Sequence, residues 1–275
     1  MQQVIPVDDI QRYTDQIDQT VIDYIKESQI ETFEGFPDYD LVAFDWYDIG
    51  GHDAPPAQII IYIDRQDMLF ICENAAALAA ARTMFTPDAT NEHAMYLFFK
   101  NLFKGSTRQI EQLENRLAAL DDDVTDGVED GLRDKLIDIR CQVMRLRKYY
   151  EQMVLVFSEI CDNDNGLISD DCLKYFEILR SRSMRLVSQA GILREYVTQI
   201  RESYQAEIGI EQNELMKVFT IVTSIFLPLT LIVGWYGMNL RMPEFGWRYG
   251  YLFVIIICLA VVAIWYVVFK RKKWF

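Results

Sequence analysis

Basic residues are scarce in this chain of 275 residues. Lysine and arginine total 27 against 41 aspartates and glutamates, so the formal net charge at pH 7 is −14. A protein that grips nucleic acid needs a basic surface to neutralise phosphates, and we therefore expect no nucleic-acid partner. The five cysteines form no Cys-x-x-Cys pair, and His52 and His93 are the only histidines. A zinc knuckle or a disulfide framework is not expected.

Sequence patterns of catalysis are also missing. We find no nucleophile–base arrangement, no cluster of metal ligands in the polar part of the chain, and no Gly-x-x-x-x-Gly-Lys-[Ser/Thr] phosphate loop. We therefore expect neither an enzyme nor an organic cofactor. The first residues lack a basic region followed by an apolar stretch, so no signal peptide is predicted.

Two apolar runs near the C-terminus contain no charged residue. They cover 218–240 and 249–269, and a helix of about 20 residues crosses a hydrocarbon core of about 30 Å. The short separation, Arg241 to Arg248, predicts a hairpin with both ends on one side of the membrane. Because the basic run Lys270 to Lys273 follows the second span, that side is expected to be the cytosol. The chain is therefore predicted to be a multi-pass protein of the cell membrane with both termini in the cytoplasm.

The polar part of the chain predicts a small domain with a sheet and helices. Apolar residues at helical spacing predict a helix over Asp8 to Ile30. Runs rich in β-branched and aromatic residues predict strands over 41–47, 58–64 and 67–72, the last two joined as a hairpin. Further helices are predicted over 75–84, 92–104, 107–120 and 132–161, with an acidic link over 121–130.

The segment Asp162-Asn-Asp-Asn-Gly superficially resembles a calcium loop. Its glycine stands at the fifth position rather than the sixth, and no glutamate closes the frame. A helix stop and restart is the preferred interpretation, with Ser169 capping the next helix.

A heptad pattern follows Ser169. It predicts packing against other helices along its length. The positions seven apart are Cys172, Leu179, Leu186, Leu193 and Ile200, and most partner positions are filled by Phe176, Ala190, Val197 and Tyr204. If this helix continues to Asn239, it has about 70 residues and a length on the order of 100 Å.

The first apolar run carries small and hydroxyl residues on one helical face. The second has no hydroxyl beyond tyrosine, as expected for a helix that faces lipid. The stripe on the first helix is Asn213, Met216, Phe219, Thr223, Leu227, Thr230 and Gly234. If several copies of the helix surround an axis, this stripe gives apolar rings that alternate with small polar ones. That arrangement is typical of a pore that closes when its apolar part loses water and opens when water returns. Small and hydroxyl residues are equally typical of helices that pack closely in an inert bundle, so spacing alone leaves both interpretations open.

Several segments of this region resemble the CorA family of magnesium channels. They are Asn213-Glu-Leu-Met-Lys-Val-Phe-Thr-Ile-Val, Phe226-Leu-Pro-Leu-Thr, Gly234-Trp-Tyr-Gly-Met-Asn, Met242-Pro-Glu and the C-terminal Tyr266 to Phe275. A lone Gly-Met-Asn is weak evidence. At the outer end of a hydroxyl-bearing span, before Met-Pro-Glu and a second span, it is specific. The resemblance is dense from 211 to 275 and only architectural before that.

The resemblance implies an α+β membrane protein with a small cytosolic αβα domain and a long stalk helix that continues into the first of two transmembrane helices. It implies a ring-forming homo-oligomer, a pentamer, in contact with membrane lipids. The implied activity is uptake of Mg2+ down the membrane potential. The expected segments are 1–168 (cytosolic α/β domain with acidic helices), 169–217 (stalk helix), 218–240 (pore-lining helix), 241–248 (outer loop), 249–269 (second transmembrane helix) and 270–275 (basic tail).

The resemblance also assigns roles to residues at the mouth. Gly237, Met238 and Asn239 would form the selectivity filter, and Glu244 in the outer loop would attract cations. Mg2+ gives up its hydration shell reluctantly, so Asn239 is expected to accept hydrogen bonds from the ion's waters. A helix C-cap is the structural alternative for this asparagine. The stripe from Asn213 to Gly234 would line the pore, with Met216, Phe219 and Leu227 as constrictions.

Gating in the family resembles feedback, in which cytosolic Mg2+ bridges acidic side chains of neighbouring subunits. Here the chain departs from the family, because the position expected to hold an interfacial aspartate is Ile178. Asp170, Asp171 or Glu177 could replace it as regulatory metal ligands, as could the acidic link over 121–130 against another subunit. Glu202, further along the stalk, is a further candidate that could face the funnel axis and attract cations. A solvated acidic surface explains each of them equally well.

Two other functions remain open. A Zn2+, Co2+ or Ni2+ transporter of the same superfamily would keep Gly-Met-Asn, although Met242-Pro243-Glu244 favours magnesium and neither histidine lies in a span. A non-transporting oligomeric membrane adaptor would use the heptad helix for assembly. The hydroxyl stripe and the mouth motif count against the adaptor.

Overall fold

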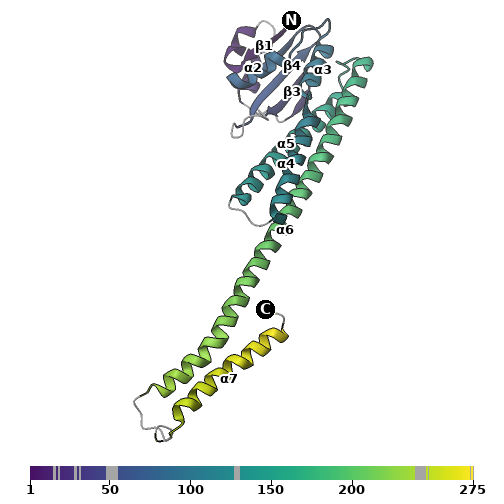
Figure 1. The fold of residues 1–275 in the computed structure, drawn as a ribbon. Coiled ribbons are helices and arrows are strands. Elements are labelled where there is room, and N and C mark those ends of the chain that lie inside the picture. The colour runs from purple at the N-terminus through teal and green to yellow at the C-terminus, as the bar shows by residue number, and fades with distance from the viewer. Residues whose placement is uncertain are drawn as a thin grey trace. The chain divides into compact units, whose positions relative to one another are not determined.

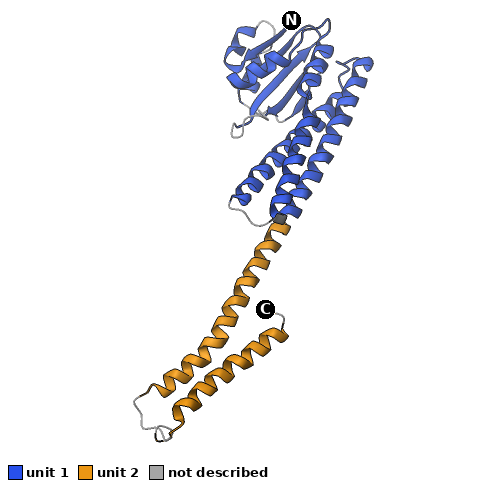
Figure 2. Cartoon of the chain, in the orientation of Figure 1, with its two compact units in different colours: residues 1–201 blue, residues 202–275 orange. Residues whose placement is uncertain are grey.

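The computed structural model describes residues 1–14, 17, 19–27, 30, 32–47, 55–126, 131–238, 246, 248–272 and 274. The chain separates into two compact units, Met1–Arg201 and Glu202–Phe275, which Figure 2 shows in different colours. Figure 1 shows the fold and labels most of the elements. One helix, α6 (Asp170–Tyr236), contributes to both units.

The first unit contains a five-stranded sheet with the strand order β1-β5-β4-β3-β2. β1 pairs in parallel with β5, and the remaining neighbours are antiparallel. The strands are β1 (Gln2–Pro6), β2 (Phe33–Gly35), β3 (Tyr39–Trp46), β4 (Ala57–Asp64) and β5 (Met68–Cys72). The three predicted strands correspond to β3, β4 and β5, including the β4–β5 hairpin.

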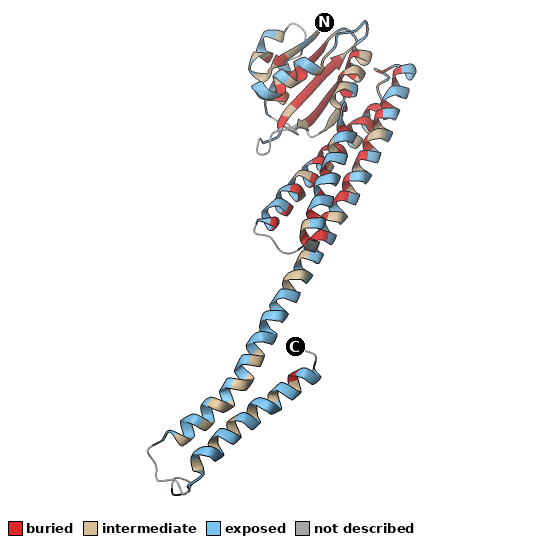
Figure 3. Ribbon diagram, viewed as in Figure 1, coloured by how far each residue is buried: buried red, intermediate tan, exposed pale blue. Residues whose placement is uncertain are grey.

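Helices cover both faces of the sheet, because alternate residues of each central strand are buried on opposite sides. On one face, Leu41 and Tyr62 join a core with the 3-10 helix η1 (Val7–Tyr13) and α1 (Gln19–Lys26). On the other, Phe44 and Phe70 pack against Phe98 of α3 (Asn91–Leu102), with ring centroids 6.4 and 4.5 Å from it. Helix α2 (Ala75–Met84) also contacts β1 and β5. The αβα arrangement is the predicted one, and Figure 3 shows the buried sheet.

Two parts of the prediction for the N-terminal region are wrong. The helix expected over Asp8 to Ile30 is divided into η1 and α1, although its apolar positions Ile10, Val21 and Ile25 are buried as their spacing indicated. The strands β1 and β2 were not predicted. β1 depends on pairing with a strand more than sixty residues later in the sequence, where Gln2 is opposite Met68.

Three long helices complete the first unit: α4 (Ser106–Asp126), α5 (Leu132–Asp162) and the first part of α6. The acidic link expected over 121–130 is partly wrong, because α4 continues through Asp126. Its apolar stripe of Ile110, Leu117, Leu120 and Val124 is buried, so packing extends the helix despite its acidic composition.

The heptad prediction is confirmed. The repeating positions of α6 are buried from Cys172 to Ile200, and Ser183, which also faces inward, donates its hydroxyl to the carbonyl of Leu179 at 3.0 Å. Tyr204, the last predicted partner position, is half-buried. α6 runs without interruption to Tyr236, through Pro228. Asn239 lies outside the described residues.

The predicted helix stop between α5 and α6 is also confirmed. Asn163 adopts a left-handed conformation (φ 47°) as the C-cap of α5, and its side chain exchanges two hydrogen bonds with the backbone of Ile168. Ser169 precedes α6 as expected, but its hydroxyl donates to Glu92 at 2.8 Å, and its backbone N–H donates to the same carboxylate at 2.6 Å. The start of α6 is thereby fixed to α3.

Asp40 of β3 is buried, with 3% of its surface exposed, and accepts a hydrogen bond from Asn165 in the α5–α6 turn at 2.6 Å. Burial raises the pKa of Asp40 to about 6, although the hydrogen bond from Asn165 acts in the opposite direction. In the unfolded chain an aspartate has a pKa of about 3.9. The folded protein therefore binds more protons between about pH 4 and 6, and the stability contributed by protonated Asp40 is lost as the pH rises through that window.

Asp40→Asn is expected to remove this pH dependence, because the amide stays neutral and its oxygen can still accept from Asn165. The variant should melt at a higher temperature than wild type at pH 7.5 and at a similar temperature near pH 4. Unfolding of the full chain can be followed by circular dichroism and by Trp46, which lies on the same strand. A melting difference that does not change with pH would contradict the assignment.

The second unit consists of the last part of α6 and α7 (Gly250–Arg271). Both helices are long and apolar enough to cross a membrane, with mean hydropathy of 2.1 and 3.1 over their most apolar stretches. Those stretches are almost unburied, at 0% and 6%. Apolar helices left uncovered in this way need lipid or other protein chains around them.

Candidate functional site

The end of α6 has one face turned toward α7. Along this part of the helix the half-buried residues recur at helical spacing, at Ile221, Ile225, Ile232 and Tyr236. Between α6 and α7 lies an apolar groove of about 800 Å3, to which α6 contributes Leu229, Val233 and Tyr236. α7 therefore covers this side of α6 only.

The predicted pore stripe lies on the side that α7 leaves uncovered. Its large members are well exposed, with Met216 at 61%, Phe219 at 67% and Leu227 at 69%. Thr223, Thr230 and Gly234 are exposed on the same side, and Asn213, also exposed, stands at the edge of this face. The structure thus brings the stripe together on one free surface. Contact with α7 therefore does not explain why Thr223, Thr230 and Gly234 are small residues.

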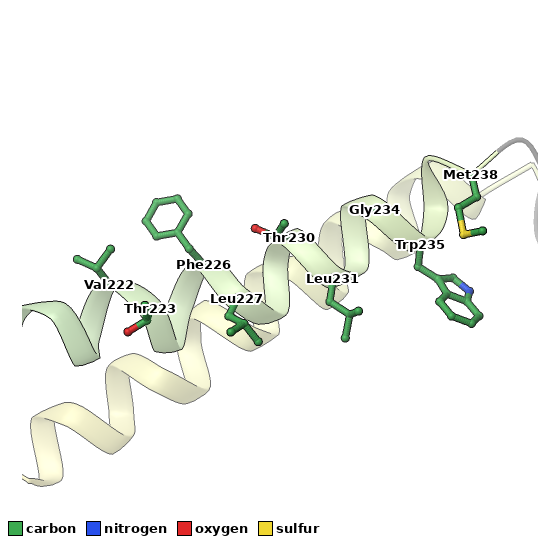
Figure 4. A pocket seen from close by; sticks show the side chains of 9 residues that line it. All are labelled: Val222, Thr223, Phe226, Leu227, Thr230, Leu231, Gly234, Trp235 and Met238. Carbon is green, nitrogen blue, oxygen red and sulfur yellow. The ribbon is translucent and has the colours of Figure 1, made fainter.

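A shallow open hollow of about 750 Å3 follows this surface, and Figure 4 shows its side chains along α6. It includes the predicted Thr223, Leu227, Thr230, Gly234 and Met238. It also includes residues that the spacing argument missed: Val222, Phe226, Leu231 and Trp235. The four lie beside the central line of the predicted stripe, and the roles of the stripe residues stay predictions.

Two threonine hydroxyls in this region donate hydrogen bonds to the backbone of their own helix. Thr223 donates its hydroxyl to the backbone carbonyl of Phe219, and Thr220 donates to that of Met216 at 2.6 Å. Since a hydroxyl has one hydrogen and two lone pairs, Thr223 retains acceptor capacity. The waters around a cation point their hydrogens outward, so a hydrated cation needs hydrogen-bond acceptors around it.

Beyond α6 the structure describes two of the three predicted filter residues. The backbone N–H of Gly237 donates to the carbonyl of Val233 at 2.8 Å. A Cβ atom at Gly237 would lie 3.0 Å from that same carbonyl oxygen, so a larger residue here would press on the backbone of the last turn. Met238 is exposed beside the hollow. Asn239 and Glu244 lie outside the described residues, and their roles stay predictions.

Residues 16–271 match the family model described as CorA-like Mg2+ transporter protein. The chain belongs to this family. The match covers the αβα unit from α1 onward and both apolar helices, and it confirms the resemblance inferred from the motifs around Gly-Met-Asn.

Two of the similar relatives are described as CorA transport proteins. The chain is 29% identical over 166 residues to the cobalt/magnesium transport protein CorA of Thermotoga maritima, which covers 60% of this chain and 47% of that protein. It is 37% identical over 99 residues to the magnesium transport protein CorA of Salmonella typhimurium, covering 36% of this chain and 31% of that protein. The chain therefore spans less than half the length of these relatives. Both are transport proteins by description.

The fold is also that of a solved CorA. The complete structure of the CorA magnesium transporter from Methanocaldococcus jannaschii superimposes with a TM-score of 0.78, over 100% of this chain and 90% of that one. The sequence identity is 19%, so this comparison establishes the fold alone.

The regulatory candidates of this CorA-family chain do not meet within one chain. Asp170 and Asp171 occupy the first turn of α6, where Lys174 binds Asp171 at 2.8 Å and lowers its pKa. Glu177 lies further along the same helix, and Glu202 belongs to the second unit. Among the described residues no three histidine, cysteine or acidic side chains gather as a metal site. A regulatory ion held by these residues would need a second chain.

Proposed function

We propose that the chain forms a membrane channel for divalent cations whose substrate is hydrated Mg2+. The family supports transport of Mg2+ as the general activity. The observation that carries the proposal for this chain is the face of α6 that α7 does not cover. On this face, hydroxyl oxygens that can accept hydrogen bonds alternate with apolar side chains.

Several copies are needed, because two helices cannot enclose a water-filled path. In a cyclic ring each copy contributes the face of α6 from Met216 to Gly234 to a shared axis, and α7 faces lipid. Five copies are expected from the family resemblance. Phe219 and Leu227 then narrow the path, and Thr223 and Thr230 accept hydrogen bonds from the ion's waters.

Selection takes place at the outer mouth in this proposal. A ring of Asn239 carbonyl oxygens holds the hydrated ion without the trapping strength of carboxylates, and Gly237 supplies the turn that follows α6. The membrane potential drives inward flow, at about 2.3 kcal/mol per charge per 100 mV and twice that for a divalent ion. The basic end of α7 keeps both termini in the cytoplasm.

Flux into liposomes that contain the purified protein tests the proposal. With an inside-negative potential we expect Mg2+ to enter, and to enter more slowly when the potential is abolished. Entry of Zn2+, Co2+ and Ni2+ is measured at the same concentration to determine which metal is preferred. If one of these ions enters faster than Mg2+, that ion is the substrate instead. Vesicles impermeable to every divalent ion would favour the adaptor function.

A second arm of the same experiment addresses regulation. We propose that cytosolic Mg2+ closes the channel by bridging subunits through residues among Asp170, Asp171, Glu177 and Glu202. Raising Mg2+ on the cytosolic side should then reduce the initial rate. Ile178 is 62% exposed, so this surface is free for a neighbouring chain.

A further inference from the structure

Phe269, near the end of α7, is buried in a part of the molecule where little else is. Its exposed fraction is 2%, whereas every other described residue of 202–275 is half-buried or exposed. Two indole rings cover it. Trp265 stacks on it at 5.3 Å between centroids and 23° between planes, and Trp274 stacks at 5.5 Å and 15°.

The backbone folds back to make this stack. α7 ends at Arg271, and the N–H of Lys272 donates to the carbonyl of Val268 at 3.1 Å. The N–H of Trp274 then donates to the carbonyl of Phe269, also at 3.1 Å. These two hydrogen bonds hold Lys272 and Trp274 against the last turn of α7.

Three cations stand around this turn: Lys270, Arg271 and Lys272. Two of their ammonium groups lie over rings, with Lys270 Nζ 6.0 Å from the centre of Tyr266 and Lys272 Nζ 5.6 Å from the centre of Trp274. The last acidic residue before them in the sequence is Glu244. None of the ion pairs found among the described residues includes these three cations. Their charge is available for an anion.

The cations lie at the level of lipid headgroups if the apolar hairpin spans a bilayer. Lys270 on α7 and Lys217 on α6 each stand about 30 Å along their helix from the turn that joins the two, at 1.5 Å per residue. That distance equals the thickness of the hydrocarbon core, about 30 Å. Indole rings also prefer this interfacial layer.

We propose that the end of α7 is a binding site for the phosphate headgroup of an anionic phospholipid in the inner leaflet. Arg271 donates to the phosphate, Lys270 and Lys272 add charge, and the stack of Trp265, Phe269 and Trp274 fixes the turn that brings them together. The inference rests on the proposed membrane placement. It goes beyond a topology signal, because a topology signal needs the charges but not the stack.

Lipid retention by the purified full-length protein tests the site. The protein is reconstituted in phosphatidylcholine with a minor fraction of phosphatidylglycerol, and bound phosphatidylglycerol is counted by native mass spectrometry. Trp274→Leu breaks the stack and keeps every charge. Arg271→Gln removes one charge at the site, and Arg248→Gln is the matched control because it removes one charge at the opposite end of the hairpin.

We expect Arg271→Gln to lower phosphatidylglycerol retention about fivefold, the contribution of one basic residue at an anionic surface. Trp274→Leu should also lower retention, although it removes no charge, because it breaks the ring stack on Phe269. Arg248→Gln should retain as much as wild type, and Trp274→Phe, which keeps an aromatic ring, should largely restore binding. Wild-type retention by Trp274→Leu would overturn the proposal in favour of diffuse charge attraction. Displacement of the lipid by inorganic phosphate would overturn it in favour of a soluble anion.

Mg2+ flux measured in the same preparations separates this inference from the proposed function. If wild type retains phosphatidylglycerol but passes no divalent ion, the channel proposal fails and the lipid site stands. If wild type passes Mg2+ and Trp274→Leu retains lipid normally, the lipid site fails and the channel proposal stands.

Discussion

Asn239→Ala is expected to abolish Mg2+ uptake while the protein still assembles. The substitution removes the side-chain oxygens that accept hydrogen bonds from the waters of the incoming ion. Alanine side chains have no oxygen to put in their place. The ion must therefore enter without that stabilisation or lose part of a hydration shell that it releases reluctantly. Uptake should fall to the level of protein-free vesicles in the liposome flux experiment, and size-exclusion chromatography should show an unchanged oligomer.

Gln199→Ala is the control for this substitution. It removes an exposed amide from the stalk part of α6, far along the helix from the apolar run, and should leave flux unchanged. The helix C-cap interpretation of Asn239 predicts a different pattern, in which Asn239→Ala lowers thermal stability and leaves residual uptake. Normal uptake by Asn239→Ala would refute the filter role.

Gly234→Leu is expected to block the channel without disturbing the single chain. A Cβ atom at Gly234 meets nothing within 4 Å in the structure, and this residue lies on the free face of α6. Leucine is also a better helix former than glycine. A chain considered alone therefore tolerates the side chain. If copies of α6 surround a common axis, a ring of leucines fills that axis and Mg2+ flux should fall by at least about tenfold.

Ala263→Leu makes a comparable enlargement on the exposed part of α7, which is expected to face lipid. Flux should be unchanged in this variant. If Gly234→Leu transports normally while Ala263→Leu is impaired, α7 rather than α6 lines the path and the assignment of the two helices must be reversed. If both variants transport Mg2+ equally well, the free face of α6 no longer supports a pore.

The parts of the fold predicted from sequence are those with a local cause. The strands of the β4–β5 hairpin follow from β-branched composition and a short connection, and the long α6 follows from a heptad repeat that buries Leu179, Leu186 and Leu193. β1 escaped notice because two of its five residues are glutamine and its partner strand is distant in sequence. The acidic end of α4 was misjudged because composition was given more weight than the continued burial of Val124.

The candidate site divides in the same way. The stripe from Asn213 to Gly234 and the Gly-Met-Asn tripeptide were found from spacing and resemblance, since each is written within a short stretch of chain. Trp235 and Phe226 as border residues of the hollow could not be found by spacing, because both lie off the central line of the stripe. The stack around Phe269 was also missed, since it depends on a backbone reversal after Arg271 that no periodic pattern announces.

The amino-acid order alone predicted the two long apolar helices, the helical seam and the family resemblance around Gly-Met-Asn, because hydropathy, heptad spacing and a short motif are properties of neighbouring residues. Tertiary structure was needed to show that α7 covers one side of α6 and leaves the side with Thr223 and Gly234 free. It was also needed to show that Trp274 returns to cover Phe269. These features arise from packing between segments, and the free energy of such contacts depends on where the rest of the chain lies.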